Sequence, residues 1–244
     1  MLCKTKGIVL RSVKYGETSL ILSVFTEVSG LQSYIVKGVR NDKAKTRRAG
    51  LLQVASLLDI VAEHKPGRQL QHIREFQPAY IYQSLQEEIV KNSIAVFSVE
   101  LLSRFLPQEE TMEDLFQFVY DYFLALDECA LNQLGNFPVY FIIQCGRFFG
   151  YNISGTYTAE TPYLNAAEGG FSAVLPASSS VVTAEDMNGL EELLSIGELR
   201  DTAVVRLNAA SRNRILDWYI QFLQYHTQHL SGLRSLQILR TILH

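Results

Sequence analysis

The first 78 residues consist of apolar runs of strand length separated by turn signals. The runs are rich in Val, Ile, Leu, Tyr and Phe: GIVLRSV, SLILSVFT, GLQSYIVKG, LLQVASLLDIVA and QLQHIREF. Residues 27–30 form a tight connection between two alternating runs, which predicts a hairpin. Five strands without a helical segment between them favour a small closed barrel over an α/β sheet. We expect residues 51–62 to form the longest strand, because this run is apolar on both faces.

After Pro78 the apolar residues recur at helical spacing. The pattern predicts helices over residues 84–106, 112–128, 138–149, 184–195, 203–230 and 233–243. Thr111 and Thr183 are the expected N-terminal caps of two of them, and Gly150 is an expected stop. Residues 151–182 are rich in turn residues and predict at most a short hairpin. The sequence thus predicts an α+β chain, with a β-barrel domain at 1–78 and an α-helical domain at 79–244 that contains an irregular insertion at about 151–182.

The positive charge of the chain is concentrated near its N-terminus, although the net charge is −3. Residues 1–48 hold ten Lys or Arg and three Asp or Glu, a net of +7, which leaves −10 for the rest. Six of these bases lie within residues 37–48, KGVRNDKAKTRR, between the third and fourth predicted strands. Clustered bases attract polyanions and make their binding depend on salt. We therefore expect a mobile basic loop that contacts a polyanion; the alternative is a solvated surface that keeps the domain soluble.

Composition excludes several other classes of protein. A content of 48% hydrophobic and 19% charged residues can form a core and excludes a disordered chain. No apolar run approaches the ~20 residues that cross a bilayer, and MLCKTKGIVL lacks the features of a signal peptide. The three cysteines are scattered and imply no disulfide framework. We expect a cytoplasmic protein.

The motifs that would indicate an enzyme are missing from the sequence. It contains no GxxxxGK[ST], GxGxxG, HExxH or GxSxG pattern. His226 and His229 supply only two ligands at helical spacing, fewer than a zinc site requires. Cys129 and Cys145 stand alone on helical patterns, which is typical of buried small apolar residues. We expect no catalytic centre and no metal; a hydrolase with an unrecognised site remains an alternative.

Three segments of the N-terminal region form a recognisable pattern: residues 1–22 (MLCKTKGIVLRSVKYGETSLIL), 25–30 (FTEVSG) and 34–40 (YIVKGVR). Together they resemble the RecO family of bacterial recombination mediators. GRFFGY at 146–151 and LRSLQILR at 233–240 are also similar to the family. The resemblance implies an OB-fold joined to a helical domain, without enzymatic turnover or cofactor. Many RecO proteins carry four zinc cysteines after the third helix, but residues 151–182 contain no cysteine, so we expect no zinc.

The resemblance also implies a function and a set of partners. Proteins of this family bind single- and double-stranded DNA, anneal complementary strands and, with RecR, help load RecA onto DNA coated by the single-strand-binding protein SSB. They also bind the acidic, hydrophobic C-terminal tail of SSB through the helical domain. The alternative for this chain is an OB-fold adaptor that binds another protein and not DNA.

An OB-fold binds nucleic acid with a basic groove and exposed aromatic rings. The expected DNA-binding residues are Lys37, Arg40, Lys43, Lys45, Arg47 and Arg48, flanked by Lys14, Arg11, Arg68, Arg74, Tyr15 and Tyr34. The alternative for both tyrosines is a position in the rim or core of the barrel. The expected pocket for the SSB tail consists of Arg147, Phe148, Arg206, Arg212, Arg214 and Trp218, with Tyr219 as a further wall. The alternative for these aromatic residues is the helical core.

Overall fold

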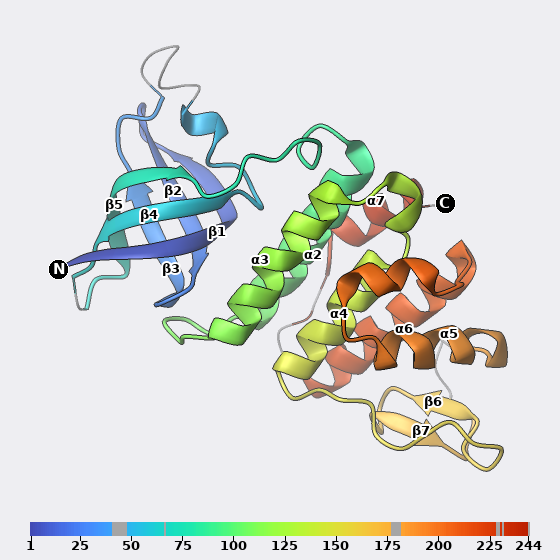
Figure 1. The fold of residues 1–244 in the computed structure, drawn as a ribbon. Helices are drawn as coiled ribbons and strands as arrows, with labels where there is room; N and C mark the ends of the chain where they lie inside the picture. Colours follow the sequence, from blue (N-terminus) through green and yellow to red (C-terminus); the bar gives the residue numbers. More distant parts are fainter. Residues whose placement is uncertain (41–47, 66, 177–181, 228–229, 231, 244) are drawn as a thin grey trace. The chain divides into compact units, whose positions relative to one another are not determined.

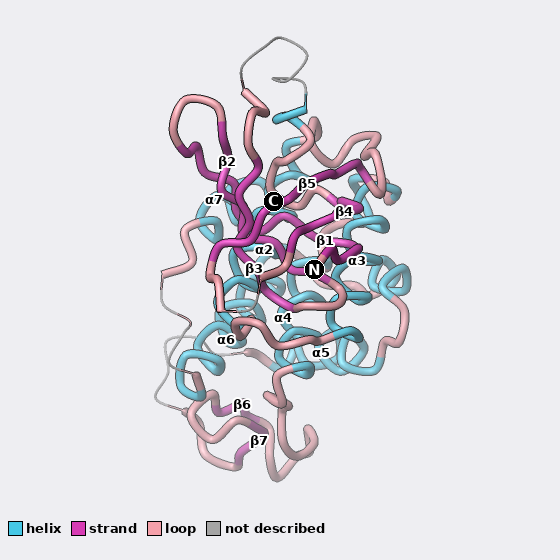
Figure 2. The backbone as a smooth tube through the Cα atoms, turned by 90° about the vertical axis from the view of Figure 1, so that its left-hand side faces the viewer, coloured by secondary structure: helices cyan, strands magenta, loops and turns pink. Residues whose placement is uncertain are grey.

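The computed structural model describes residues 1–40, 48–65, 67–176, 182–227, 230 and 232–243. The chain divides into two compact units, each of which is built from two stretches of sequence. The barrel unit comprises residues 1–83 and 106–124, and the helical unit comprises residues 84–105 and 125–244. Figure 1 shows both units, coloured along the sequence. In Figure 2 the strands lie in the barrel and in one small hairpin.

The barrel consists of five strands that close in the order β1-β2-β3-β5-β4. Only the β3–β5 pair is parallel; the other four pairs are antiparallel. This OB-like barrel and the helices that follow it confirm the predicted α+β fold. The strands are β1 (Leu2–Tyr15), β2 (Ser19–Thr26), β3 (Gly30–Val36), β4 (Leu57–Glu63) and β5 (Leu70–Pro78).

The prediction of a long strand over residues 51–62 was wrong, because β4 begins only at Leu57 and β1 is the longest strand. Residues 51–55 form turns, and Ala55 has a φ of +67° that interrupts any extended run. The segment is apolar because Leu52 lies in the core of the barrel and Ala55 is also buried. The apolar character of this segment therefore reflects burial, and not strand pairing.

A segment from beyond the predicted boundary at residue 78 packs on the barrel. Residues 106–124 belong to this unit and include most of helix α3 (Glu113–Glu128). The ring of Phe116 meets that of Phe25 on β2 edge-on, with 5.4 Å between centroids. Gly30 has a φ of +61°, and a Cβ atom there would collide with the Glu110 backbone. This part of α3 therefore covers the Phe25 end of β2.

The helical unit contains five helices and a short hairpin within its described residues. Helix α2 starts later than predicted because residues 84–88 form a turn tied to Asp127, which accepts hydrogen bonds from the Ser84 and Leu85 N–H groups (2.9 and 2.7 Å). The predicted helix over 203–230 was wrong at its start: Asn208 caps α6 by accepting a bond from Ser211 N–H (2.8 Å). The elements are α2 (Ile89–Phe105), α4 (Phe137–Phe148), β6 (Tyr163–Asn165), β7 (Gly170–Ser172), α5 (Ala184–Ser195), α6 (Ala209–His226) and α7 (Ser235–Ile242), with 3₁₀ turns at Leu131–Gln133 and Leu199–Val204.

Other predictions for this unit were confirmed. Helix α5 spans 184–195 as expected, with Thr183 as its cap: the Thr183 N–H donates to Asp186 at 2.8 Å. Helix α4 ends two residues before Gly150, which has a φ of +81°. The β6–β7 hairpin lies within the turn-rich segment 151–182. Among the described residues, none of the helices has the length and apolar character that spanning a bilayer requires.

Candidate nucleic-acid interface

The strand registers define one outer face of the barrel. Leu22, Val24 and Tyr34 point into the core, so their neighbours along each strand point outward. The outward positions pair in rows across β1, β2, β3 and β5; one such row joins Val13, Ile21, Ile35 and His72. We call this surface the open barrel face and define it by Arg11, Val13, Tyr15, Ser19, Ile21, Ser23, Ser33, Ile35, Leu70 and His72.

The open barrel face combines exposed apolar side chains with the guanidinium of Arg11. Tyr15 is 54% exposed, Val13 41% and Leu70 38%. Phe25, the next outward position of β2 after Ser23, is instead covered by Phe116 of α3. A surface with an exposed aromatic ring, aliphatic side chains and a cation is suited to stacking with the unpaired nucleobases of single-stranded DNA.

Beside this face lies a cavity of about 190 Å³ between the end of β3, the β4–β5 connection and β5. Buried Gln71 shapes the connection: its Oε1 accepts from Lys65 N–H (2.9 Å), and its Nε2 donates to the carbonyls of Lys65 (3.0 Å) and Arg68 (2.8 Å). These bonds hold two basic residues at the cavity. We call it the basic cavity; its lining is Lys37, Glu63, Lys65, Arg68, Leu70, Gln71, His72 and Arg74.

The charges around the basic cavity shift the pKa values of two of its groups. Hydrogen bonds from Lys65 and Arg74 lower the pKa of Glu63 to about 2. Burial, reinforced by the positive charges of Arg74 and Lys37, lowers the pKa of His72 below its ordinary value. The buried Nδ1 of His72 has no hydrogen-bond partner among the described residues. The cavity is thus a site of concentrated positive charge that contains a single carboxylate.

The structure brings together some of the predicted DNA-binding residues. Arg11 and Tyr15 lie on the open barrel face, and Lys37, Arg68 and Arg74 line the basic cavity beside it. Arg40 lies at the β1–β2 turn that follows Tyr15, because its guanidinium donates to the Gly16 carbonyl (3.3 Å). Sequence reasoning missed Lys65 and His72. Lys65 belongs to a recognisable turn, but the position of His72 depends on the parallel pairing of β3 with β5, which no local pattern indicates.

Other predicted residues lie elsewhere. The expectation that Tyr34 stacks on bases needs correction: it is 2% exposed in the barrel core, where burial raises its pKa to about 12. Lys14 pairs with inward-facing Leu20 and so lies on the opposite side of β1 from Arg11. The Arg48 guanidinium lies 5.0 Å from the ring centroid of Phe76. Lys43, Lys45 and Arg47, which lie in the predicted basic loop, fall outside the described residues.

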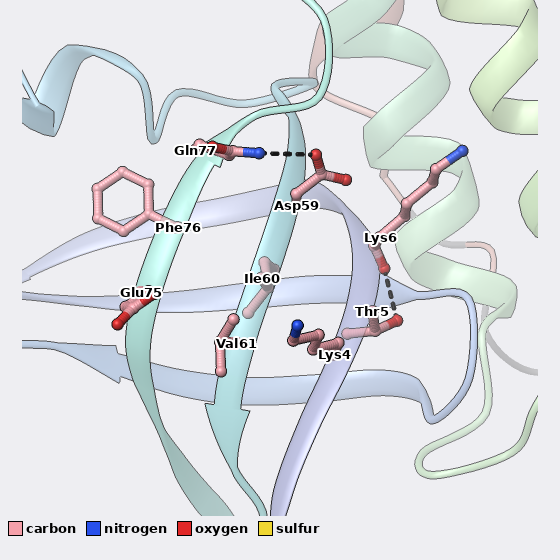
Figure 3. Close-up of a pocket in the computed structure, with 9 residues that line it drawn as sticks. All are labelled: Lys4, Thr5, Lys6, Asp59, Ile60, Val61, Glu75, Phe76 and Gln77. Atoms are coloured by element: carbon pink, nitrogen blue, oxygen red, sulfur yellow. Dashed lines mark hydrogen bonds between the residues drawn. The ribbon is translucent and has the colours of Figure 1, made fainter.

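A second hollow of about 470 Å³ lies on the other side of the barrel, over β1, β4 and β5 (Figure 3). Here bases alternate with acids: Lys4 and Lys6 share the lining with Asp59 and Glu75. Figure 3 shows the amino groups of the two lysines directed away from each other, and the Lys6 amino group lies 5.0 Å from the ring centroid of Tyr120. Mixed signs of charge do not concentrate a positive field, so this hollow suits a polyanion less well.

The residues predicted to bind the SSB tail do not form one pocket. Arg147 donates to the Leu194 carbonyl, Arg212 to the Leu207 carbonyl (2.7 Å), and Arg214 to buried Asp186 (2.8 and 2.7 Å). The expectation for the aromatic walls needs correction, because Trp218 and Tyr219 are 0% and 2% exposed. The Trp218 ring stacks on Phe222 in the core of the helical unit. Arg206 and Phe148 are exposed.

A different set of residues in the helical unit combines apolar and basic character. A shallow hollow between α4, α6 and α7 places Arg212 and Arg240 beside leucine side chains. The Nε atoms of both arginines are buried and have no hydrogen-bond partner among the described residues. Sequence reasoning missed Arg240, although it closes the segment at 233–240. We call this surface the arginine hollow; its lining is Gly135, Pro138, Val139, Arg212, Asn213, Leu216, Leu239, Arg240 and Leu243.

The cysteine and histidine side chains offer little to a metal ion. His226 Nε2 lies 3.1 Å from the Ala166 carbonyl oxygen, and His229 is not among the described residues. In the part of the chain that the structure describes, no three His, Cys, Asp or Glu side chains gather closely enough to hold a metal. Cys145 is buried, which raises the pKa of its thiol, and Cys129 is partly buried.

The fold and the basic face define a class: proteins in which an OB-like barrel precedes a helical region. Comparison with known proteins narrows the class. Residues 1–82 match the family "Recombination protein O N terminal", and residues 86–237 match "Recombination protein O C terminal". The chain therefore belongs to the RecO family of DNA repair proteins.

Curated relatives match over almost the whole chain. The DNA repair protein RecO of Bacteroides fragilis is 29% identical over 245 residues, and that of Flavobacterium psychrophilum is 28% identical over 244. The DNA repair protein RecO of Christiangramia forsetii is 26% identical over 242 residues. Each match covers 99% of both chains. The similarity therefore extends over the barrel and the helical unit alike.

Proposed function

We propose that this protein is a non-enzymatic recombination mediator, located in the cytoplasm, that binds single- and double-stranded DNA through the open barrel face and the basic cavity. The observation that carries the proposal is that Arg11 and the exposed ring of Tyr15 lie on the open barrel face, while Lys37 and Arg68 line the basic cavity, which shares Leu70 and His72 with that face. Within the described residues, none of these three bases has an ion-pair partner, so their charges are available to an external anion. Membership of the RecO family supports the same role.

The chemistry of this surface suits binding that does not depend on the DNA sequence. Contacts to phosphate oxygens carry no base identity, and a stacked ring accepts any base. Cations that neutralise the phosphates of two strands also reduce the repulsion between them, which gives a physical route to annealing. The proposal includes the further steps that the family resemblance implies: action with RecR, and help in loading RecA onto DNA coated by SSB.

We place the binding site for the SSB tail at the arginine hollow. Its leucines suit the apolar side chains of that tail, and the Nε atoms of Arg212 and Arg240, which have no hydrogen-bond partner among the described residues, can donate to its carboxylates once Arg240 leaves Asp217. A fluorescent peptide with the sequence of the SSB tail should bind the protein, and Arg240→Ala should weaken binding about tenfold. Arg206→Ala, which removes an exposed base outside the hollow, should change little. Equal effects of both substitutions would contradict this placement.

A charge-removal experiment tests DNA binding. The triple variant Arg11→Ala, Lys37→Ala, Arg68→Ala should bind a labelled oligothymidylate about 100-fold more weakly than the parent at low salt, because each base stabilises contact with a phosphate. A control variant with Lys4→Ala, Arg200→Ala and Arg234→Ala removes the same charge from other surfaces and should lose less than threefold.

Two results would contradict the proposal. Equal losses in the two triple variants would show that only net charge matters. A parent protein that binds no DNA but forms a stable complex with another protein would favour the adaptor alternative.

A further inference from the structure

One carboxylate lies among the cations of the basic cavity. Glu63 is near the end of β4, where it pairs with His72 of β5. Its Oε1 lies 2.9 Å from Lys65 Nζ, and its Oε2 accepts from Arg74 Nε at 3.1 Å. A second guanidinium nitrogen of Arg74 also contacts Oε2. Two oxygens held between an ammonium and a guanidinium form the arrangement in which proteins bind a phosphate.

We propose that the basic cavity is a subsite for one backbone phosphate of single-stranded DNA, and that Glu63 is the internal anion this phosphate must displace. The inference rests on the proposed function, since it assumes that DNA binds the adjoining face. Without DNA, the Glu63 carboxylate pairs with both Lys65 and Arg74 and offsets one of their two positive charges. When DNA binds, a phosphate takes over these two cations and the carboxylate moves toward solvent.

The remaining lining residues fit this exchange. Lys37 and Arg68 have no recorded acidic partner among the described residues, so they can attract the phosphate before Glu63 has moved. The volume of about 190 Å³ exceeds that of several water molecules. Gln71 fixes the backbone at Lys65 and Arg68, so the subsite is largely formed in advance.

The competitor gives the site a physical property that bare cations would lack. Binding of the phosphate at the cavity breaks the two ion pairs that Glu63 makes with Lys65 and Arg74, so the net gain in affinity is smaller than the number of bases suggests. A small anion cannot compensate for that loss, whereas a strand with many phosphates can. The arrangement thus favours polyanions and keeps binding weak enough for a strand to be released.

The test compares Glu63→Gln with Glu75→Gln. Glu75 is an exposed acid on β5 that lines the other hollow and has no recorded ion-pair partner in the described part of the barrel. Both substitutions remove one negative charge from the barrel. Glu63→Gln should tighten binding of a labelled oligothymidylate about fivefold at moderate salt, whereas Glu75→Gln should change it less than twofold. The salt dependence of the Glu63→Gln variant should equal that of the parent, because the same phosphate occupies the cavity in both complexes and only the cost of displacing the carboxylate is removed.

A second variant links the effect to the pair of cations. Arg74→Ala in the Glu63→Gln background should remove most of the gain, and circular dichroism should show both variants folded. If Glu63→Gln binds no more tightly than the parent, or gains no more than Glu75→Gln, the competitor role is wrong while the proposed function stands. If neither the parent nor Glu63→Gln binds DNA, both proposals are wrong.

Discussion

The basic residues of the two units differ in their partners. In the helical unit, Arg147 and Arg212 donate to backbone carbonyls, and Arg214 and Arg240 pair with aspartates. In the barrel unit, Lys65 and Arg74 pair with Glu63, but Arg11, Lys14, Lys37 and Arg68 have no ion-pair partner among the described residues. The comparison teaches that a count of bases does not locate a binding surface. A Lys or Arg that is already paired within the fold contributes less to the binding of an external anion than a Lys or Arg that faces only water.

Among the variants that test this comparison, Asp186→Asn in the helical unit should have the largest effect, which is a loss of folding stability. Asp186 is fully buried, and Arg214 binds both of its oxygens. Burial alone would raise the pKa of Asp186, but its hydrogen bonds with Arg214, Ser211 and Thr183 hold that pKa well below its ordinary value. Asp186→Asn leaves Arg214 without its counter-charge, so we expect a loss of ~3–5 kcal/mol in the free energy of unfolding, measured with urea. Because the depressed pKa belongs to an acid, the stability from this pair is lost as the pH falls.

The same variant tests the division of roles between the units. At a temperature where Asp186→Asn remains folded, its affinity for DNA should equal that of the parent. Glu128→Gln breaks the exposed pair with Arg200 and should cost less than ~1 kcal/mol. If Asp186→Asn weakened DNA binding and left stability unchanged, the contrast between internal and available bases would be wrong.

A smaller effect on DNA affinity should distinguish Tyr15 from Tyr34, the two tyrosines that the sequence analysis predicted to bind DNA. Tyr15→Ala should weaken binding to single-stranded DNA by ~1–3 kcal/mol, because a nucleobase of the DNA loses the ring on which it stacks. Duplex DNA should be affected less, since its bases stack on each other. Tyr34→Phe keeps the buried ring and should bind both forms of DNA as the parent does. Fluorescence anisotropy with matched single and double strands gives the two affinities, and an equal loss on both strands would argue against stacking by Tyr15.

How far the sequence predicted the structure depended on whether the signal was local. The apolar runs in residues 2–36 predicted β1, β2 and β3, and buried positions alternate with less buried ones along part of β2 and β3. The apolar run at 51–56 was wrongly predicted to be part of a strand, because Leu52 and Ala55 are buried in a turn. The segment 203–230 misled because periodicity alone does not show that Asn208 starts a new helix.

The site was harder to predict than the fold, because it depends on contacts between distant segments. Clustered bases pointed to the N-terminal region, where Arg11 lies on the open barrel face and Lys37 lines the basic cavity. The side of the barrel to which Tyr34 points depends on strand register. The role of Glu63 depends on the pairing of β4 with β5, which brings it to Arg74. No pattern along the chain contains that information.

The most direct test of the central claim is the salt dependence of DNA binding. The affinity of the parent for oligothymidylate, measured between about 50 and 200 mM salt, should fall linearly on a double-logarithmic plot. The variant lacking Arg11, Lys37 and Arg68 should give a slope shallower by about 2, since each lost phosphate contact accounts for about 0.7. The control lacking Lys4, Arg200 and Arg234 should keep the parental slope. Identical slopes for all three proteins would show that the open barrel face and the basic cavity do not bind the DNA backbone.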